Sequence, residues 1–281
     1  MKIQWYPGHM TKAKRMMQED IKLIDLVIEL LDARIPVSSR NPDIDTLAQN
    51  KSRLILLNKA DLADERVTSG WVEYFQKKGL AVIKLDARQK TCMKQISNAI
   101  LEVCKEKIER DRKKGIINRP VRAMVAGIPN VGKSTFINSF AGKSCAKTGN
   151  KPGVTKGKQW IRLNKNVELL DTPGILWPKF DDEKVGTDLS FIGSVNDQIL
   201  NLTELVLEFI DFITREYPGI FEERYGIETA EPVKMLESTA LARGCLKKGA
   251  EPDYDKAANL IFDDFRSGKI GKISIEKPED Y

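Results

Sequence analysis

Residues 121–142 read VRAMVAGIPNVGKSTFINSFAG, and this stretch decides the fold. An apolar run predicts a strand, a glycine-containing loop follows it, and the next residues favour a helix. The loop matches G-x-x-x-x-G-K-[ST], a pattern whose backbone N–H groups and helix N-terminus surround phosphate. A structural glycine turn is the alternative, which the strand before the loop and the helix after it disfavour. The residues expected to contact a nucleotide here are Asn130, Val131, Gly132, Lys133, Ser134 and Thr135.

Each polar side chain of this loop has an expected task. Lys133 reaches the β- and γ-phosphates, which gives it a catalytic role, and the Ser134 hydroxyl binds Mg²⁺. Asn130 is the position at which potassium-activated GTPases hold a K⁺ ion, and we hypothesise the same use here. Equal activity in Na⁺ and in K⁺ would count against that hypothesis.

Apolar strands and helices alternate on both sides of the loop. Strands are expected within residues 24–36, 53–61 and 80–87 before it, and within residues 167–175 after it. Nearly continuous apolar runs are typical of strands that are buried on both faces. Helices are expected between them, so the pattern predicts an α/β fold with a parallel, doubly wound sheet. This domain spans residues 1–178 and includes a helix at 11–22.

The pattern changes after about Pro178. Residues 196–218 form a long amphipathic helix with Ile199, Leu202, Leu205, Val206 and Phe209 at helical spacing. Further helices are expected at 233–243 and 254–267, and a strand is expected only at KISIE (272–276). Residues 179–281 are therefore predicted to form a smaller, all-helical domain.

A guanine-reading motif lies well before the phosphate loop, in RLILLNKAD (53–61). Asn58, Lys59, Ala60 and Asp61 follow a buried strand, where the Asp61 carboxylate can accept hydrogen bonds from guanine N1 and N2. Adenine lacks this pair of donors, so buried polar groups would stay unpaired. Asp86 and Ala87, followed by Arg88, fit the second base loop, whose backbone contacts guanine O6, although Ser is usual where Asp86 stands.

Two further motifs complete the expected site. Asp171 begins D-x-x-G, with its carboxylate near Mg²⁺ through a water, and the Gly174 N–H meets the γ-phosphate. Thr155, in a basic stretch between the two glycine motifs, is expected to complete the Mg²⁺ shell and to sense the γ-phosphate. An ordinary turn threonine is the alternative for Thr155.

The motifs occur in an unusual order, because ordinary small GTPases place the phosphate loop first. A parallel sheet tolerates such a rearrangement if each strand keeps its neighbours, and residues 105–118 can supply the join. We therefore expect a circularly permuted P-loop GTPase. Ile175 stands where Ras-like enzymes have the glutamine that orients water. His9, the single histidine, is a tentative catalytic candidate, with a surface or hinge histidine as the alternative.

Charge and cysteine content point to a soluble protein that binds polyanions. The net charge is +6, and residues 141–165 contain seven basic residues and no acidic one, which favours an RNA-facing surface. The four scattered cysteines show no metal-ligand spacing, and no apolar run is long enough to span a bilayer. A cytoplasmic location with reduced thiols is expected. Basic positions that could neutralise phosphates lie near the C-terminus, at Arg243, Lys247, Lys248, Arg266, Lys269 and Lys272.

The chain resembles the ribosome biogenesis GTPase A family from end to end. The resemblance is carried by WYPGHM (5–10), LLDARIP (30–36), LLNKADLAD (56–64), GIPNVGKSTFIN (127–138), LLDTPGILWPKF (169–180) and RYGI (224–227). It implies a Ras-like domain followed by a helical RNA-binding domain, with GTP or GDP and Mg²⁺ as ligands. It also implies a role in late assembly of the bacterial large subunit: binding the precursor 50S particle and its rRNA, and release after hydrolysis.

Two other functional classes stay open at this point. One is a nucleotide-dependent module that acts on another RNA, and the other is a P-loop kinase, which Asn58–Asp61 disfavours. No DNA or membrane partner is expected, and the protein is expected to be monomeric away from the ribosome.

Overall fold

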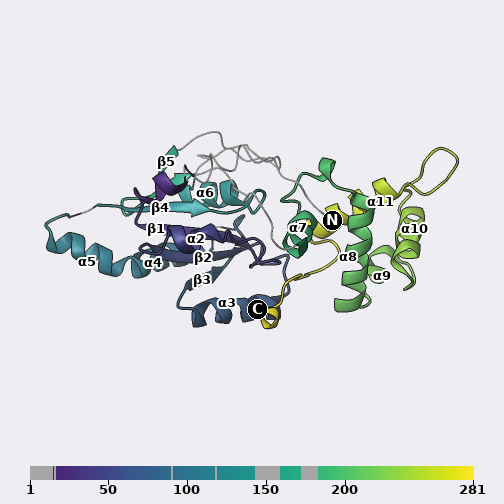
Figure 1. The fold of residues 1–281 in the computed structure, drawn as a ribbon, viewed down its shortest axis with the longest axis horizontal. Coiled ribbons are helices and arrows are strands. Elements are labelled where there is room, and N and C mark those ends of the chain that lie inside the picture. Colours follow the sequence, from purple (N-terminus) through teal and green to yellow (C-terminus); the bar gives the residue numbers. More distant parts are fainter. Residues whose placement is uncertain (1–14, 16, 90, 118, 143–158, 172–182) are drawn as a thin grey trace. The chain divides into compact units, whose positions relative to one another are not determined.

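The computed structural model describes residue 15 and residues 17–89, 91–117, 119–142, 159–171 and 183–281. These residues divide into two compact units. One contains the described residues from 15 to 171 together with Ser274–Tyr281, and the other contains residues 183–273. Figure 1 shows the sheet of the first unit and the helices of the second.

Six strands form one sheet in the order β3-β2-β1-β4-β6-β5. They are β1 (Leu26–Asp32), β2 (Ser52–Asn58), β3 (Ala81–Lys84), β4 (Val121–Ala126), β5 (Gln159–Arg162) and β6 (Val167–Asp171). Every pair is parallel except β5 with β6, which is antiparallel. The strands expected before residue 178 are present, whereas the edge strand β5 was not anticipated.

Strand β1 lies in the middle of the sheet, between β2 and β4, and all seven of its residues are buried. Burial on both faces explains its nearly continuous apolar sequence. Because neighbouring parallel strands run in one direction, Asp32, Asn58 and the loop after Ala126 meet at one edge of the sheet. In open α/β sheets this carboxyl edge is where ligands bind.

The helices with described bounds that accompany the sheet are α2 (Asp43–Leu47), α3 (Glu65–Lys77), α4 (Met93–Val103), α5 (Lys105–Lys113) and α6 (Lys133–Ala141). Ile44 of α2 packs with Val27 and Met124. Trp71 of α3 packs with Leu31 and Leu57. Since Val27 and Leu31 are an even number of residues apart on β1, α2 and α3 cover the same face. Residues 17–21 are helical, within the helix expected at 11–22.

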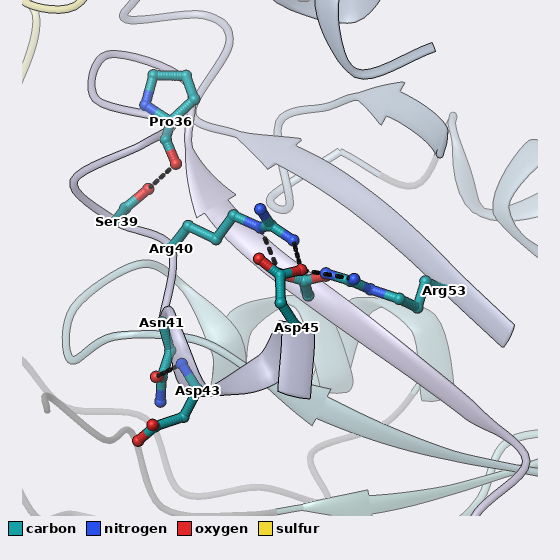
Figure 2. Close-up of polar contacts among 8 residues, drawn as sticks. Pro36, Ser39, Arg40, Asn41, Asp43, Asp45 and Arg53 are labelled. Atoms are coloured by element: carbon teal, nitrogen blue, oxygen red, sulfur yellow. Dashed lines mark hydrogen bonds and ion pairs between the residues drawn. The ribbon is translucent and has the colours of Figure 1, made fainter. Parts of the chain in front are cut away.

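Loop 33–42 connects β1 to α2 and is held by an arginine cluster, of which Figure 2 labels Arg40, Asp45 and Arg53. The cluster consists of Glu29, Arg40, Asp45 and Arg53. The buried Glu29 carboxylate accepts from Arg40 Nε and from Arg53 Nε, each at 3.0 Å. Asp45 of α2 accepts from the same two arginines, at 2.5 and 2.7 Å. The loop is thereby tied to β1, β2 and α2 by its last turn.

The second unit is helical. Its helices are α7 (Glu183–Phe191), α8 (Leu202–Glu216), α9 (Ile220–Tyr225), α10 (Pro232–Ala242) and α11 (Tyr254–Arg266). Phe209 of α8 is fully buried and its ring lies 4.7 Å from that of Phe265 and 5.7 Å from that of Phe262, both on α11. The helix expected at 196–218 begins only at Leu202, where the Asn201 side chain caps it, after a 3-10 turn at Asp197–Ile199.

The C-terminal tail (Ser274–Tyr281) belongs to the sheet-containing unit, although the sequence boundaries assigned it to the helical domain. The strand expected at 272–276 is wrong, because Ile275 and Glu276 both donate their N–H groups to a single carbonyl oxygen, that of Arg34. A ladder needs alternating partners along the neighbouring chain. Figure 1 shows the C-terminus beside α3, where the Tyr281 ring lies 5.7 Å from that of Trp71.

Candidate guanine-nucleotide site

The Asn58 side chain joins the three loops that the motifs predict. Its amide nitrogen donates to the Val131 carbonyl of the phosphate loop at 2.7 Å. Its amide oxygen accepts from the Ala87 N–H of the second base loop at 2.9 Å. The side chain is only 2% exposed, so both bonds are shielded from water. The fold therefore brings segments that are distant in sequence into one site.

Two glycines of the phosphate loop are required by close contacts. A Cβ at Gly132, where φ is +96°, would lie 2.4 Å from the Asn58 amide nitrogen. A Cβ at Gly127 would lie 2.8 Å from the Leu30 carbonyl oxygen. Asn130, between them, also has a left-handed backbone, with φ of 59°. The loop thus keeps the strained shape that lets its backbone surround an anion.

Helix α6 presents its N-terminus to this loop. Gly132 is its N-cap residue and has no side chain to accept from the N–H groups of the first turn. Uncapped N–H groups and the helix dipole together favour a bound phosphate. Lys133, the first helical residue, is 7% exposed and places a cation at the same point. Ser134 and Thr135 follow and are half-buried. These features fit a nucleotide phosphate group.

The base-reading segment is held by charged neighbours. Lys59, with a left-handed φ of 59°, extends its ammonium to within 3.1 Å of Asp32 Oδ2. Asp61 accepts from Arg88 Nη2 at 2.6 Å, and Arg88 also donates through Nε to Asp86 at 2.9 Å. Arg88 thus links the two carboxylates that follow β2 and β3. Hydrogen bonding from Arg88 is the largest influence on Asp86 and holds the pKa of that carboxyl below its usual value.

The second base loop differs from the simplest expectation in its backbone. The Ala87 N–H, expected to contact guanine O6, donates to Asn58 instead. The Arg88 N–H donates to Asp86 Oδ1 at 3.0 Å. Asp86 therefore organises its own turn, as a serine hydroxyl could do only in part. The contact from Ala87 to the base stays a prediction.

Motif reasoning did not assign Asp32 and Arg34 to the site. Arg34 is fully buried and donates to Asp32 Oδ1 and Oδ2, from Nε at 2.9 Å and from Nη2 at 2.8 Å. Burial raises the pKa of Asp32, but the charges of Arg34 and Lys59 outweigh it, so the pKa lies well below its ordinary value. The available signal was a carboxylate at the end of the most apolar strand, LVIELLD, two residues before an arginine.

Comparison with known proteins supports the same interpretation. A family model described as 50S ribosome-binding GTPase matches residues 122–237. A relative from Bacillus cereus named "Ribosome biogenesis GTPase A" is 48% identical, and the alignment covers 100% of this chain and 96% of that protein. The chain belongs to the ribosome biogenesis GTPase A family.

Solved structures of YlqF share the fold. A GDP-bound YlqF has a TM-score of 0.69 and 31% identity, covering 95% of this chain and 100% of that one. A GNP-bound YlqF from T. maritima has a TM-score of 0.68 and 32% identity, covering 96% and 100%. The expected α/β P-loop GTPase fold followed by a smaller helical region is confirmed.

Of the expected Mg²⁺ ligands, Ser134 and the Asp171 backbone lie within the described residues. Ser134 is the second residue of α6, and a hydroxyl at this position suits a metal bound beside a phosphate. The register pairs the Asp171 backbone with Val125, near the start of the phosphate loop. Thr155, Gly174 and His9 lie outside the described residues. Within the described part, no group of three or more acidic, cysteine or histidine side chains could hold a metal by itself.

The basic residues near the C-terminus do not all face outward. Arg266 donates to Asp197 at 2.6 and 2.9 Å and to the Phe191 carbonyl at 2.9 Å, so it holds the helical unit together. Lys269 is paired with Asp264 at 3.2 Å. Lys247 and Lys248, by contrast, are exposed in a turn closed by the bridge between Leu246 and Pro252. Arg266 is therefore a poor candidate for an RNA contact, and the turn is a better one.

Among the described residues, no helix is both long enough and apolar enough to cross a membrane.

Proposed function

We propose that this member of the ribosome biogenesis GTPase A family is a GTP-hydrolysing assembly factor of the precursor 50S subunit. It binds GTP with Mg²⁺, engages rRNA in the particle, promotes a late maturation step and is released once GTP is hydrolysed. It works in the cytoplasm and is monomeric away from the ribosome. Family membership supports the reaction and the class of partner.

The observation that carries the nucleotide assignment is the position of Asn58. One buried amide bonds both the phosphate loop and the second base loop, so the base-reading and phosphate-binding parts have a fixed separation. A single ligand with a guanine at one end and phosphates at the other fits such an arrangement. A kinase that accepts any purine would not need the Asn58–Asp61 segment at this place.

Each side of the site has its own task in this proposal. Asp61 accepts from guanine, while Lys133 and the N-terminus of α6 bind the β- and γ-phosphates. When bound, Mg²⁺ neutralises phosphate charge, and Ser134, Thr155 and Asp171 are its proposed ligands. The roles of Gly174 and His9 and the K⁺ site at Asn130 stay predictions. Unchanged maximal, particle-stimulated hydrolysis in a His9→Ala variant would remove His9 from the list.

The order of the strands supports a circular permutation. Strands β1–β3, which carry the base motif, lie on one side of β4, and β6 and β5 lie on the other. Each half of the chain thus forms one side of the sheet, and a chain break between α5 and β4 would leave every strand with its neighbours. The rearrangement also places D-x-x-G directly before residues 183–273, the helical unit. We infer that this order allows a nucleotide-dependent change at D-x-x-G to reach the RNA-binding helices.

Nucleotide competition tests the site. A fluorescent GDP should bind the wild-type chain and be displaced by GTP but not by a large excess of ATP. Asn58→Ala should weaken binding more than about tenfold, because two buried hydrogen bonds are lost. Asn259→Ala, at an exposed position of α11, is the matched control and should bind normally. Equal displacement by ATP and GTP would refute the guanine assignment.

Sedimentation with ribosomal particles tests the partner. The chain should co-sediment with precursor 50S particles in a non-hydrolysable GTP analogue and should leave them in GDP. Lys247→Glu with Lys248→Glu should reduce retention, and this loss should be largest at low salt. Lys113→Glu with Lys114→Glu, the same charge change at the exposed end of α5, is the control. Retention on tRNA, or on no particle, would instead support the alternative RNA-binding module.

A further inference from the structure

We propose that Glu276 in the C-terminal tail is a positioning residue for guanine recognition, acting on Lys59 and Asn58 through loop 33–42. This proposal rests on the guanine-nucleotide binding proposed above. It gives the chain that leaves the helical unit a direct influence on nucleotide affinity. The contacts that carry it all lie within the sheet-containing unit.

The Glu276 carboxylate is fully buried and is satisfied by loop 33–42. Oε2 accepts from the Val37 N–H at 2.7 Å, and Oε1 accepts from the Ser38 N–H at 2.8 Å. The Ser38 hydroxyl and the Tyr281 hydroxyl also donate to Oε1, the latter at 3.1 Å. A buried charge with this many donors fixes the geometry of whatever supplies them. Glu276 therefore fixes the turn at residues 37–38.

Loop 33–42 passes this constraint to the base-reading motif. The Arg34 carbonyl accepts from Ile275 N–H at 2.8 Å and Glu276 N–H at 3.2 Å. The Arg34 side chain grips Asp32, whose Oδ2 lies 3.1 Å from the Lys59 ammonium. In addition, the Ala33 N–H donates to the Asn58 carbonyl at 2.8 Å. The backbone of loop 33–42 joins the Glu276 carboxylate partners Val37 and Ser38 to Arg34, and from the Arg34 side chain onward each step to Lys59 is a direct polar contact.

The tail also holds the other end of the base-reading segment. The Asp64 N–H, three residues after Asp61, donates to the Ser274 hydroxyl at 3.1 Å. The Trp71 indole N–H donates to the Glu276 carbonyl at 3.2 Å, which fixes α3 to the tail. The tail thus supports the segment from Asn58 to Asp64 at both ends: through loop 33–42 at Asn58, and directly through Ser274 at Asp64.

This support matters because the segment contains a strained residue. Lys59 has a positive φ, which costs free energy for a residue with a side chain and persists only where the surroundings impose it. Asp61 follows within the same turn and must place both carboxylate oxygens opposite guanine N1 and N2. A looser Lys59 would therefore weaken base reading specifically.

The main test is Glu276→Gln, with Glu279→Gln as the control. Both change one carboxylate of the same tail to an amide, but Glu279 is exposed. Affinity is measured for GDP and for inosine diphosphate, which lacks the 2-amino group that Asp61 accepts from. We expect Glu276→Gln to weaken GDP binding about tenfold, the cost of one disturbed charged hydrogen bond. It should also reduce the preference for GDP over inosine diphosphate, whereas Glu279→Gln should change neither value.

A double-mutant cycle separates positioning from general stability. If Glu276 acts through Lys59, then Glu276→Gln in a Lys59→Met background should change GDP affinity less than about twofold. An unchanged GDP affinity in the single variant, an unchanged base preference, or additive effects in the cycle would overturn the proposal. If Glu276→Gln does not fold, Tyr281→Phe removes one donor to Oε1 and should give a smaller change of the same kind. Failure of the wild-type chain to bind GDP would instead refute the proposed function.

Discussion

Loop 33–42 is held from two sides, and the two supports differ in kind. The arginine cluster of Glu29, Arg40, Asp45 and Arg53 bonds side chain to side chain, and Asp45 is 53% exposed. The C-terminal tail bonds mainly to the loop backbone, through Glu276, which is fully buried. Ion pairs near water are screened and adaptable, whereas buried bonds to backbone fix a conformation. The rigid support is the C-terminal tail, which contacts Arg34 and, through Arg34, Asp32 and Lys59.

The same contrast separates two carboxylates of β1. Asp32 and Glu29 are both at most 2% exposed. Asp32 faces Arg34, whose side chain is 1% exposed, while Glu29 faces Arg40 and Arg53, which are 19% and 15% exposed. If the Asp32 carboxylate is removed, water cannot solvate the buried Arg34 guanidinium. If the Glu29 carboxylate is removed, water can still reach Arg40 and Arg53. The exposure of the arginine partners should therefore decide how much unfolding free energy is lost with each carboxylate.

The largest effect is expected for Asp32→Asn. Breaking a buried ion pair by removing one charge typically costs about 3–5 kcal/mol, because the remaining charge stays buried. The free energy of unfolding, measured by urea denaturation at neutral pH without nucleotide, should fall by this amount. A loss no greater than that of Glu29→Gln under the same conditions would contradict the contrast between the two carboxylates.

Acid should remove the advantage of Asp32 in a defined way. Its pKa in the folded chain lies below the ordinary value of 3.8, so its contribution to stability is present above that pH and is lost as the pH falls. The difference in unfolding free energy between wild type and Asp32→Asn should be constant above about pH 5 and should shrink by about 1.4 kcal/mol per pH unit below 3.8. Urea titrations of both chains between pH 6 and pH 3 measure it. A difference that stays constant to pH 3 would show that Asp32 has an ordinary pKa.

Much of the fold could be predicted because its signals are local. The apolar runs of β1 and β2 are too continuous for half-exposed strands, and the amphipathic spacing around Leu205 and Phe209 identifies α8. Strand β5 was missed because QWIR has only four residues and places its two apolar residues side by side, so it shows no strand periodicity. It is also an edge strand that pairs only with β6. The KISIE segment has a strand-like sequence but is bound by Arg34 and loop 33–42, a contact that no local pattern encodes.

The site divides in the same way between local and distant information. Glycines at 127 and 132 and the Asn58–Asp61 motif are recognisable because the chemistry of phosphate and guanine demands those residue types. The pairing of Arg88 with Asp61 and of Asp32 with Lys59 joins residues from different loops. Such pairs depend on which strands are neighbours. They could not be predicted without knowing that β2 lies between β1 and β3 in the sheet.

An intermediate effect is expected for Glu29→Gln. The amide can still accept one hydrogen bond, and both arginines keep Asp45 and some access to water. We expect a loss of about 2 kcal/mol in unfolding free energy, near that of a charged hydrogen bond. GDP affinity should change less than in Glu276→Gln, since Glu29 bonds Arg40 and Arg53, whereas the tail contacts Arg34, which bonds the Lys59 partner Asp32. Equal losses of GDP affinity would remove the functional distinction between the supports.

The smallest effect is expected for Asp45→Asn. Burial raises the pKa of Asp45, but hydrogen bonds from Arg53 and the charge of Arg40 outweigh this effect, so the pKa lies below its ordinary value. The carboxylate is therefore ionised at neutral pH, and both ion pairs are formed. Because Asp45 is 53% exposed, water and salt compete for those pairs, and the loss of stability should be less than about 1 kcal/mol. Raising NaCl from about 0.05 M to 1 M should remove most of it. The Asp32→Asn loss, measured in parallel, should persist in high salt, because ions do not reach a pair that is shut off from solvent. A salt response shared by both variants would mean that the two supports of loop 33–42 are electrostatically alike.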